Sequence, residues 1–190
     1  MKPRLAATTL VTTLALTAGT GGIVAAQETP SLMANLVDDV SQVESKLVGL
    51  ARAIPAEDWD WRPMDGVRSV SEVFKHVIAD NYLLTIPVGV PAPAETGITS
   101  DYQSAVAFES RDLSRDEIIE TLEASFAHVK AAMEAEGDEA LGEMVDLFGN
   151  QAPQQRLWVL ATVHMHEHLG QMIAYARSNE VVPPWSRGGM

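Results

Sequence analysis

The sequence predicts an all-α protein, a four-helix bundle with long crossover connections. Apolar residues recur at spacings of three and four over long segments, which is the period of an amphipathic helix. Two of these segments open with a capping box, and no segment shows the alternation of apolar and polar residues that marks a strand. With 190 residues, the chain is long enough for one domain with a sizeable core.

Residues 1–26 have the composition of a secretory signal peptide. "MKPR" supplies a positive start, a mildly apolar stretch follows, and "GGIVAAQ" offers small residues before a cleavage point after Ala26. The alternative is an uncleaved N-terminal anchor, which the short length and the many threonines disfavour. We therefore expect residues 27–190 to form the folded domain and to lie outside the cytoplasm, either in the periplasm or secreted.

The first helix is predicted from Ser31 to Ala53. A loop with two prolines and two tryptophans follows it. The second helix opens at Ser69, which has capping-box spacing with Glu72, and it runs to Leu84. The apolar stripe of the first helix consists of Leu32, Leu36, Val40, Val43, Leu47 and Leu50.

A connection rich in proline and glycine, residues 85–103, follows the second helix and is expected to be non-helical. The third helix begins at a second capping box, formed by Ser114 and Glu117. It stops near Gly137, because glycine readily adopts the left-handed conformation that ends a helix.

The stretch between the third and fourth helices, residues 137–153, is expected to be irregular. The fourth helix has Pro153 in its first turn and continues through Arg177. It ends there because Asn179 can adopt a left-handed conformation and because two prolines follow shortly afterwards.

The composition excludes several kinds of function. The chain has no cysteine, which excludes disulfides, thiolate ligands, cysteine nucleophiles and lipid attachment to cysteine. Its formal charge of −13 argues against a nucleic-acid partner and against attraction to anionic lipid. No run of apolar residues is long enough for a stable membrane span. A small-molecule substrate or ligand remains as the expected partner.

Three of the five histidines alternate in "VHMHEHLGQMIAYAR", residues 163–177. A helix turns about 100° per residue, so His164 and His168 lie about 40° apart around the axis and about 6 Å apart along it. His166 lies about 200° from His164, on the opposite side. The alternation is therefore an inward pair and one outward residue. The inward stripe consists of Leu157, Ala161, His164, His168, Gln171 and Tyr175.

Two imidazoles on an inward stripe need a partner, because burying an unpartnered polar group costs roughly 2 kcal/mol or more. His76 is the candidate third ligand of a metal ion, since it lies on the expected inward stripe of the second helix. Three imidazoles would leave coordination positions open, as catalytic sites require. Such a pair also arises by chance on helices, so ordinary packing stays open here. His128 is expected to lie outside the site. The other members of the second-helix stripe are Val73, Ala79 and Leu83.

The pair differs from the zinc-protease motif, which needs glutamate directly after the first ligand and histidine four residues later. His164 is followed by Met165, which disfavours that class of protease. Asp80 lies one turn beyond His76 and is a fourth ligand, an acceptor for an imidazole N–H or a surface carboxylate. Three further residues either line a pocket or pack within the bundle: Trp61, Arg62 and Tyr82.

Three stretches carry a family pattern. They are "IPAEDWDWRPMDGVRSVSEVFKHVIADN", "VHMHEHLGQMIAYAR" with its His-x-x-x-His-x-Gly-Gln signature, and "VVPPWS". Together they resemble the DinB-like family, which is related to metal-dependent bacterial thiol transferases. The resemblance implies a DinB-like four-helix bundle and a divalent metal ion held by His76, His164 and His168. It implies zinc, nickel, iron or manganese without choosing among them.

The resemblance also implies roles for two residues that follow the second ligand of the pair. Gly170 would permit a close approach of another helix. Gln171 would orient a ligand or a bound water, with plain packing as the alternative. Family members often form homodimers, so a homodimer is a further expectation.

The activity is open among three alternatives. The first is a metal-dependent enzyme, either a thiol transferase or a catalyst of another Lewis-acid or hydrolytic reaction. The second is a non-catalytic module outside the cytoplasm that binds a metal or a small ligand. The third is a fold whose histidines bind nothing. The export signal disfavours thiol transfer, because small thiols are scarcer outside the cytoplasm.

Overall fold

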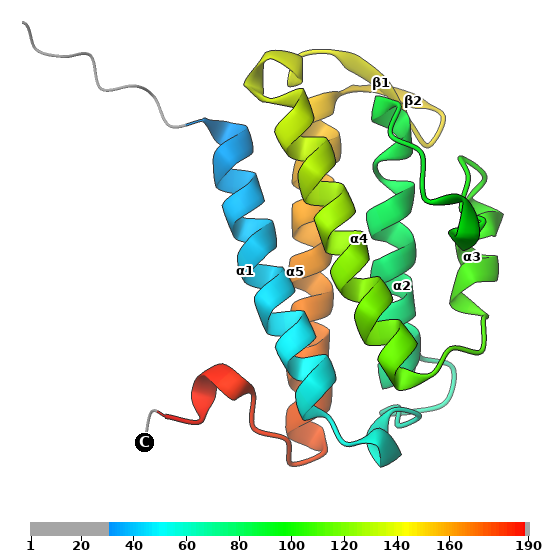
Figure 1. The fold of residues 1–190 in the computed structure, drawn as a ribbon, viewed down its shortest axis with the longest axis vertical. Helices are drawn as coiled ribbons and strands as arrows, with labels where there is room; N and C mark the ends of the chain where they lie inside the picture. Colours follow the sequence, from blue (N-terminus) through cyan, green and yellow to red (C-terminus); the bar gives the residue numbers. More distant parts are fainter. Residues whose placement is uncertain (1–30, 189–190) are drawn as a thin grey trace, which may run out of the picture.

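Four long helices form a bundle in the computed structural model, which describes residues 31–188 (Figure 1). The predicted four-helix bundle is confirmed, and each helix end lies within one residue of its predicted position. The predicted signal peptide, residues 1–26, lies outside the described residues. The bundle consists of α1 (Leu32–Ala53), α2 (Val70–Leu83), α4 (Arg115–Glu136) and α5 (Gln154–Ser178).

The helices are ordered so that α1 and α2 each pack against both α4 and α5. Figure 1 shows that α1 and α5 run in one direction and that α2 and α4 run in the other. A long crossover between α2 and α4 returns the chain to the end of the bundle from which α2 started, as the sequence predicts. Because α2 and α5 are antiparallel neighbours, their inward faces meet along the middle of the bundle.

The two predicted capping boxes are present. Glu72 accepts a hydrogen bond from the backbone N–H of Ser69 at 2.7 Å, and Glu117 accepts one from Ser114 at 2.8 Å. Each box satisfies backbone groups that have no partner within the helix itself. The two boxes therefore fix where α2 and α4 begin.

The crossover contains a helix that the sequence did not predict, α3 (Tyr102–Glu109). The Asp101 side chain caps it by accepting from the backbone N–H of Gln103 at 3.0 Å. Ala105 and Phe108 are buried where α3 packs on α2. A helix this short gains its stability from packing, which explains why the local sequence did not reveal it.

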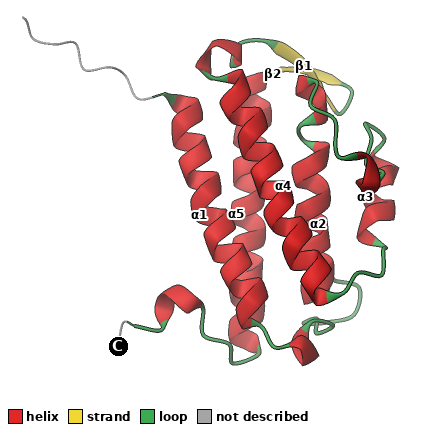
Figure 2. Ribbon diagram, viewed as in Figure 1, coloured by secondary structure: helices red, strands yellow, loops and turns green. Residues whose placement is uncertain are grey.

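A two-stranded antiparallel hairpin joins α4 to α5, where irregular structure was predicted (Figure 2). Its strands are β1 (Met144–Leu147) and β2 (Asn150–Pro153). Val145 and Leu147 are buried, whereas β2 is polar and ends in proline. Only β1 has an apolar side, so the alternation that would predict a hairpin is incomplete.

The hairpin turn has an unusual residue at its tip. Phe148 has a φ of 55° and Gly149 a φ of 82°, so both adopt the left-handed conformation. Two-residue turns of this type favour asparagine or glycine at both positions. A left-handed conformation costs a residue with a Cβ roughly 1–2 kcal/mol. Phe148 therefore adopts a backbone conformation in this turn that phenylalanine disfavours.

The end of α5 differs from the prediction in one residue. Asn179 has a φ of −102°, and the left-handed residue is Glu180, with a φ of 60°. The helix closes one residue later because the backbone N–H of Val181 donates to Ala176 at 2.9 Å. Within residues 31–188, the helices fall short of the length and apolar character needed to cross a membrane.

Candidate metal centre

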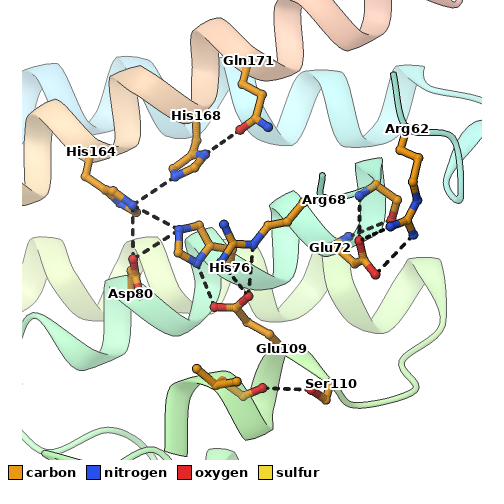
Figure 3. Close-up of polar contacts among 12 residues, drawn as sticks. Arg62, Arg68, Glu72, His76, Asp80, Glu109, Ser110, His164, His168 and Gln171 are labelled. Carbon is orange, nitrogen blue, oxygen red and sulfur yellow. Dashed lines mark hydrogen bonds and ion pairs between the residues drawn. The ribbon is translucent and has the colours of Figure 1, made fainter. Parts of the chain in front are cut away.

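Three histidines meet between α2 and α5 (Figure 3). The Nε2 atom of His164 lies 3.3 Å from Nε2 of His76 and 3.0 Å from Nε2 of His168. One ring nitrogen from each residue lies within 4.8 Å of the other two. The structure thus brings together the three residues that the sequence proposes as ligands.

The inward stripes of α2 and α5 explain this meeting. His76 and His168 are only 7% and 8% exposed. The stripe neighbours of His76 on α2, and most of those of the pair on α5, are also buried. These buried neighbours are Val73, Ala79, Leu83, Leu157, Ala161 and Tyr175. Helical periodicity therefore places all three rings on the shared interface.

The other two histidines lie elsewhere, as expected. His166 is exposed, and its Nδ1 lies 3.0 Å from the carbonyl oxygen of Thr162, one turn back on the same helix. His128 is on α4, where its Nε2 lies 3.0 Å from the hydroxyl of Thr85 and its ring meets Tyr82 edge-on. Neither belongs to the group of three.

The outer nitrogens of two rings are held by oxygen acceptors. Nδ1 of His76 lies 2.8 Å from Oε1 of Glu109, and Nδ1 of His168 lies 2.8 Å from Oε1 of Gln171. A carboxylate or amide oxygen can only accept, so each Nδ1 carries the proton of its neutral ring. The Nε2 atoms of His76 and His168 are therefore unprotonated, and their lone pairs point into the cluster.

The orientation of Gln171 is itself fixed. Its amide Nε2 donates to the hydroxyl of Tyr175 at 3.0 Å, and that hydroxyl donates to the carbonyl oxygen of Arg68 at 3.1 Å. The amide oxygen is consequently the group that faces His168. Of the two roles predicted for Gln171, the structure favours orientation of a histidine over plain packing.

Asp80 adds a fourth electron-rich group to the cluster. Its Oδ2 lies 3.1 Å from Nε2 of His164 and 3.5 Å from Nε2 of His76. The side chain is 14% exposed, and its Oδ1 is buried without a hydrogen-bond partner among residues 31–188. Asp80 is therefore not a surface carboxylate, which leaves the roles of ligand and acceptor.

The donor set fits a divalent cation. The lone pairs of His76 and His168 and the carboxylate of Asp80 all face His164, whose Nε2 can donate one hydrogen bond at most. A cation would satisfy all of these groups at once. Two nitrogens bound to zinc at tetrahedral positions lie about 3.3 Å apart, which is close to the separations found here.

Burial keeps the two rings on α5 neutral. It lowers the pKa of His164 to about 3, and the nearby His168 and His76 rings act in the same direction. Burial also lowers the pKa of His168 below its usual value. Neutral imidazole is the form that binds metal ions. Near neutral pH, these two rings are therefore in the protonation state that binding of a cation requires.

Glu109, the last residue of α3, is part of the site although the sequence analysis missed it. Its Oε2 pairs with the guanidinium of Arg68 at 3.1 Å, while its Oε1 accepts from His76. Burial raises the pKa of Glu109, but the hydrogen bonds from His76 and Arg68 and the guanidinium charge of Arg68 outweigh burial and lower it overall. Glu109 therefore stays anionic and orients His76.

For Asp80, in contrast, the effect of burial outweighs the other effects on the pKa. Burial raises the pKa of that carboxyl above its usual value; the Glu109 charge adds to the shift, and the Arg68 charge opposes it. The two carboxyl groups beside His76 are thus pushed apart in pKa. Glu109 therefore stays anionic beside His76, whereas burial weakens the preference of Asp80 for its charged form.

The remaining predicted residues are dispersed. Trp61 packs edge-on against Tyr175 at 5.3 Å between ring centroids, and Tyr82 packs on His128. Arg62 pairs with Glu72 and lines a surface cleft of about 560 Å³ beside Glu109. We call it the basic cleft, after its three cations Arg62, Arg68 and Lys75.

Gly170 does not have the role that the resemblance implies. It is exposed on α5, and a Cβ added there would meet no atom within 4 Å. The prediction that it permits a close helix approach is therefore wrong within this chain. The reason is its position, two residues past His168, on the outward side of the helix.

Comparisons with known proteins agree with this architecture. A family model described as the DinB superfamily matches residues 39–172. No curated protein matches the chain. A DinB-like protein from Bacillus cereus has a TM-score of 0.65 at 17% identity, covering 80% of this chain and 95% of that one.

Two structures from Bacillus subtilis are also similar. The DinB-like protein YjoA has a TM-score of 0.60 at 19% identity, with 78% of this chain and 93% of that one covered. YfiT, described as a probable metal-dependent hydrolase with an unusual four-helix bundle topology, has a TM-score of 0.63 at 15% identity, with 82% and 93% covered. At these identities the likeness shows a shared fold.

Proposed function

The chain belongs to the DinB superfamily, and we propose that it is a metal-dependent hydrolase whose divalent ion is held by His76, His164 and His168. The observation that carries the proposal is the convergence of the three Nε2 atoms, with the outer nitrogens of His76 and His168 already paired. Three imidazoles suit zinc, nickel or iron better than magnesium or calcium, which prefer oxygen ligands.

A divalent ion bound here would polarise a carbonyl or phosphoryl group and lower the pKa of a bound water. The chain would supply the remaining functions. Glu109 and Gln171 hold two of the rings in one orientation, so the donor atoms are positioned before an ion arrives. The Oδ2 atom of Asp80 lies 3.1 Å from Nε2 of His164, which positions this carboxylate to accept a proton from water at the cluster.

Hydrolysis is favoured over thiol transfer on two grounds. The carboxylate of Asp80 beside the donor set provides the base that activation of water requires. YfiT, which shares the fold, is described as a probable metal-dependent hydrolase. We also propose that the protein acts outside the cytoplasm, because residues 1–26 have the order of regions found in signal peptides.

The test is metal analysis joined to an activity screen. We expect about one zinc, nickel, iron or manganese ion per purified chain, and hydrolysis of an ester, amide or phosphoester that His164→Ala abolishes. Stoichiometric metal with transfer of a thiol to an electrophile, but no hydrolysis, would replace the hydrolase by a transferase. Metal without either activity would establish a binding module.

Export has a separate test. N-terminal sequencing of the protein recovered from the periplasm or medium should begin at Gln27. A mature protein that retains Met1 and stays with the membrane would contradict the proposal of a cleaved signal.

A further inference from the structure

A second cleft, of about 580 Å³, lies between the end of α2, the start of α3 and the tip of the hairpin. Its volume is in the range of sites that bind small molecules. We call it the apolar cleft, after the residues that form most of its wall: Leu83, Ile86, Pro87, Tyr102 and Phe148.

The apolar cleft and the metal centre share one face of α2. Leu83 follows His76 by seven residues, which places it about 20° away around the helix and about 10 Å further along it. Asp80 lies between them on the same face. The helix α3 lies beside α2 (Figure 1), with Tyr102 in the cleft and Glu109 at His76. Both α2 and α3 therefore contribute residues to the cleft at one end and to the metal centre at the other.

Phe148 is the residue that points to a ligand. Its side chain is 59% exposed and lines the cleft, yet its backbone has the left-handed conformation that phenylalanine disfavours. The carboxylate of Asp146 helps to hold this turn by accepting from the backbone N–H of Gly149 at 2.7 Å. Strained residues that persist without packing benefit are concentrated at ligand sites, and Phe148 contributes its ring to the cleft rather than to the core.

We propose that the apolar cleft binds an uncharged aromatic or aliphatic group of the substrate, while the bond to be hydrolysed lies at the metal centre. The second half of this statement rests on the proposed function. The apolar walls and the exposed Tyr102 and Phe148 rings favour such a group. Asp146 is the charged residue in the wall, and it disfavours an anion.

Two dyes with the same rings test the chemistry of the ligand. N-phenyl-1-naphthylamine is uncharged, and 8-anilinonaphthalene-1-sulfonate adds one sulfonate. The uncharged dye should bind the full chain with enhanced fluorescence, and the sulfonate should bind about two- to fivefold more weakly because of the exposed carboxylate of Asp146. Equal or tighter binding of the sulfonate would overturn the assignment of an uncharged group.

The variant Phe148→Asn separates binding from folding. Asparagine suits the turn, so this variant should unfold at the same or a higher temperature than the wild type. It should nevertheless bind the uncharged dye at least about tenfold more weakly. Met144→Gln is the matched control, since Met144 is on the same hairpin with the same 59% exposure but is not in the cleft wall. Unchanged binding by Phe148→Asn, or an equal loss in the control, would overturn the proposal.

A metal-loaded sample tests the link between the two sites. Nickel added to the wild type should quench the bound dye, because Leu83 in the cleft wall lies only about 10 Å along α2 from the proposed ligand His76. His164→Ala should bind the dye normally and show no quenching. Dye binding that nickel does not quench in a loaded wild type would overturn the shared placement. A wild type that binds the dye but takes up no metal would overturn the proposed hydrolase and leave the apolar cleft standing.

Discussion

The inner face of α5 carries His164 and His168, and its outer face carries His166, two residues from either. On the inner face, buried rings meet a third histidine from α2 and the carboxylate of Asp80. On the outer face, the exposed ring contacts the backbone of its own helix. Three identical side chains within five residues therefore have different chemistry, and the rotation of the helix decides which is which.

The inner face also depends on residues that α5 does not supply. Glu109 of α3 holds His76, and Arg68 holds Glu109 in turn. The donor atoms are thus oriented by a framework of hydrogen bonds, whereas the orientation of His166 rests on Thr162 of its own helix. This difference yields four predictions about the two faces.

The largest difference should appear in metal content. His164→Ala should reduce it from about one ion per chain to below about 0.1, because a ligand is lost from a three-imidazole set. His166→Ala should keep the full complement, since its ring lies outside the cluster. Elemental analysis after desalting measures both, and a reversed result would show that the faces are wrongly assigned.

Acid should destabilise the metal-free protein through the inner face. The folded-state pKa of His164 is about 3, whereas the unfolded residue titrates near 6.5, so the unfolded state binds more protons between these values. The contribution of His164 is complete above about pH 6.5 and is lost as the pH falls toward 3, by a few kcal/mol at most.

Urea unfolding in a chelator at a series of pH values measures this dependence. His164→Ala should show a flatter profile, and His166→Ala should follow the wild type. A wild type whose unfolding free energy is constant between pH 6.5 and 4 would contradict the lowered pKa.

Glu109→Gln should weaken metal binding about 10- to 100-fold, the usual effect of removing the carboxylate partner of a ligating histidine. The substitution keeps the shape of the side chain but removes the charge that fixes Nδ1–H of His76. Competition with a chelator of known affinity gives the change. Glu123→Gln is the control, because Glu123 forms an exposed pair with Arg52 away from the site, and an equal effect there would argue against orientation of His76.

The smallest effect is expected at Gln171. Gln171→Leu removes the acceptor for His168 and should weaken metal binding by about tenfold or less, because this hydrogen bond is neutral. Gln171→Glu retains an acceptor and should restore most of the affinity. If both variants bind metal like the wild type, the ring of His168 is oriented by packing alone.

The parts of the fold that the sequence predicts are those specified locally. Capping boxes at Ser69 and Ser114, and apolar residues at helical spacing, mark the four long helices within one residue. The same spacing separates His164 and His168 from His166. These signals are local, because a helix fixes the relative direction of its side chains from sequence spacing alone.

The features that the sequence analysis did not predict depend mainly on contacts between segments that are distant in the sequence. Glu109 contacts His76, which lies 33 residues earlier in the sequence, and the local sequence of the short helix α3 does not predict that contact. The hairpin was not predicted because its turn contains Phe148 at a position where asparagine or glycine is usual. Asp80 had three open roles until the structure placed it in the cluster, since burial cannot be read from one carboxylate on a helix.

The hairpin is anchored by Val145 and Leu147, which are buried, while Phe148 and Gly149 project at its tip. The exposed residue at position 148 can therefore be changed without disturbing the helices that carry the histidines. Random libraries at position 148, with Gly149 kept for its left-handed backbone, should yield folded proteins far more often than libraries on the inner face of α5.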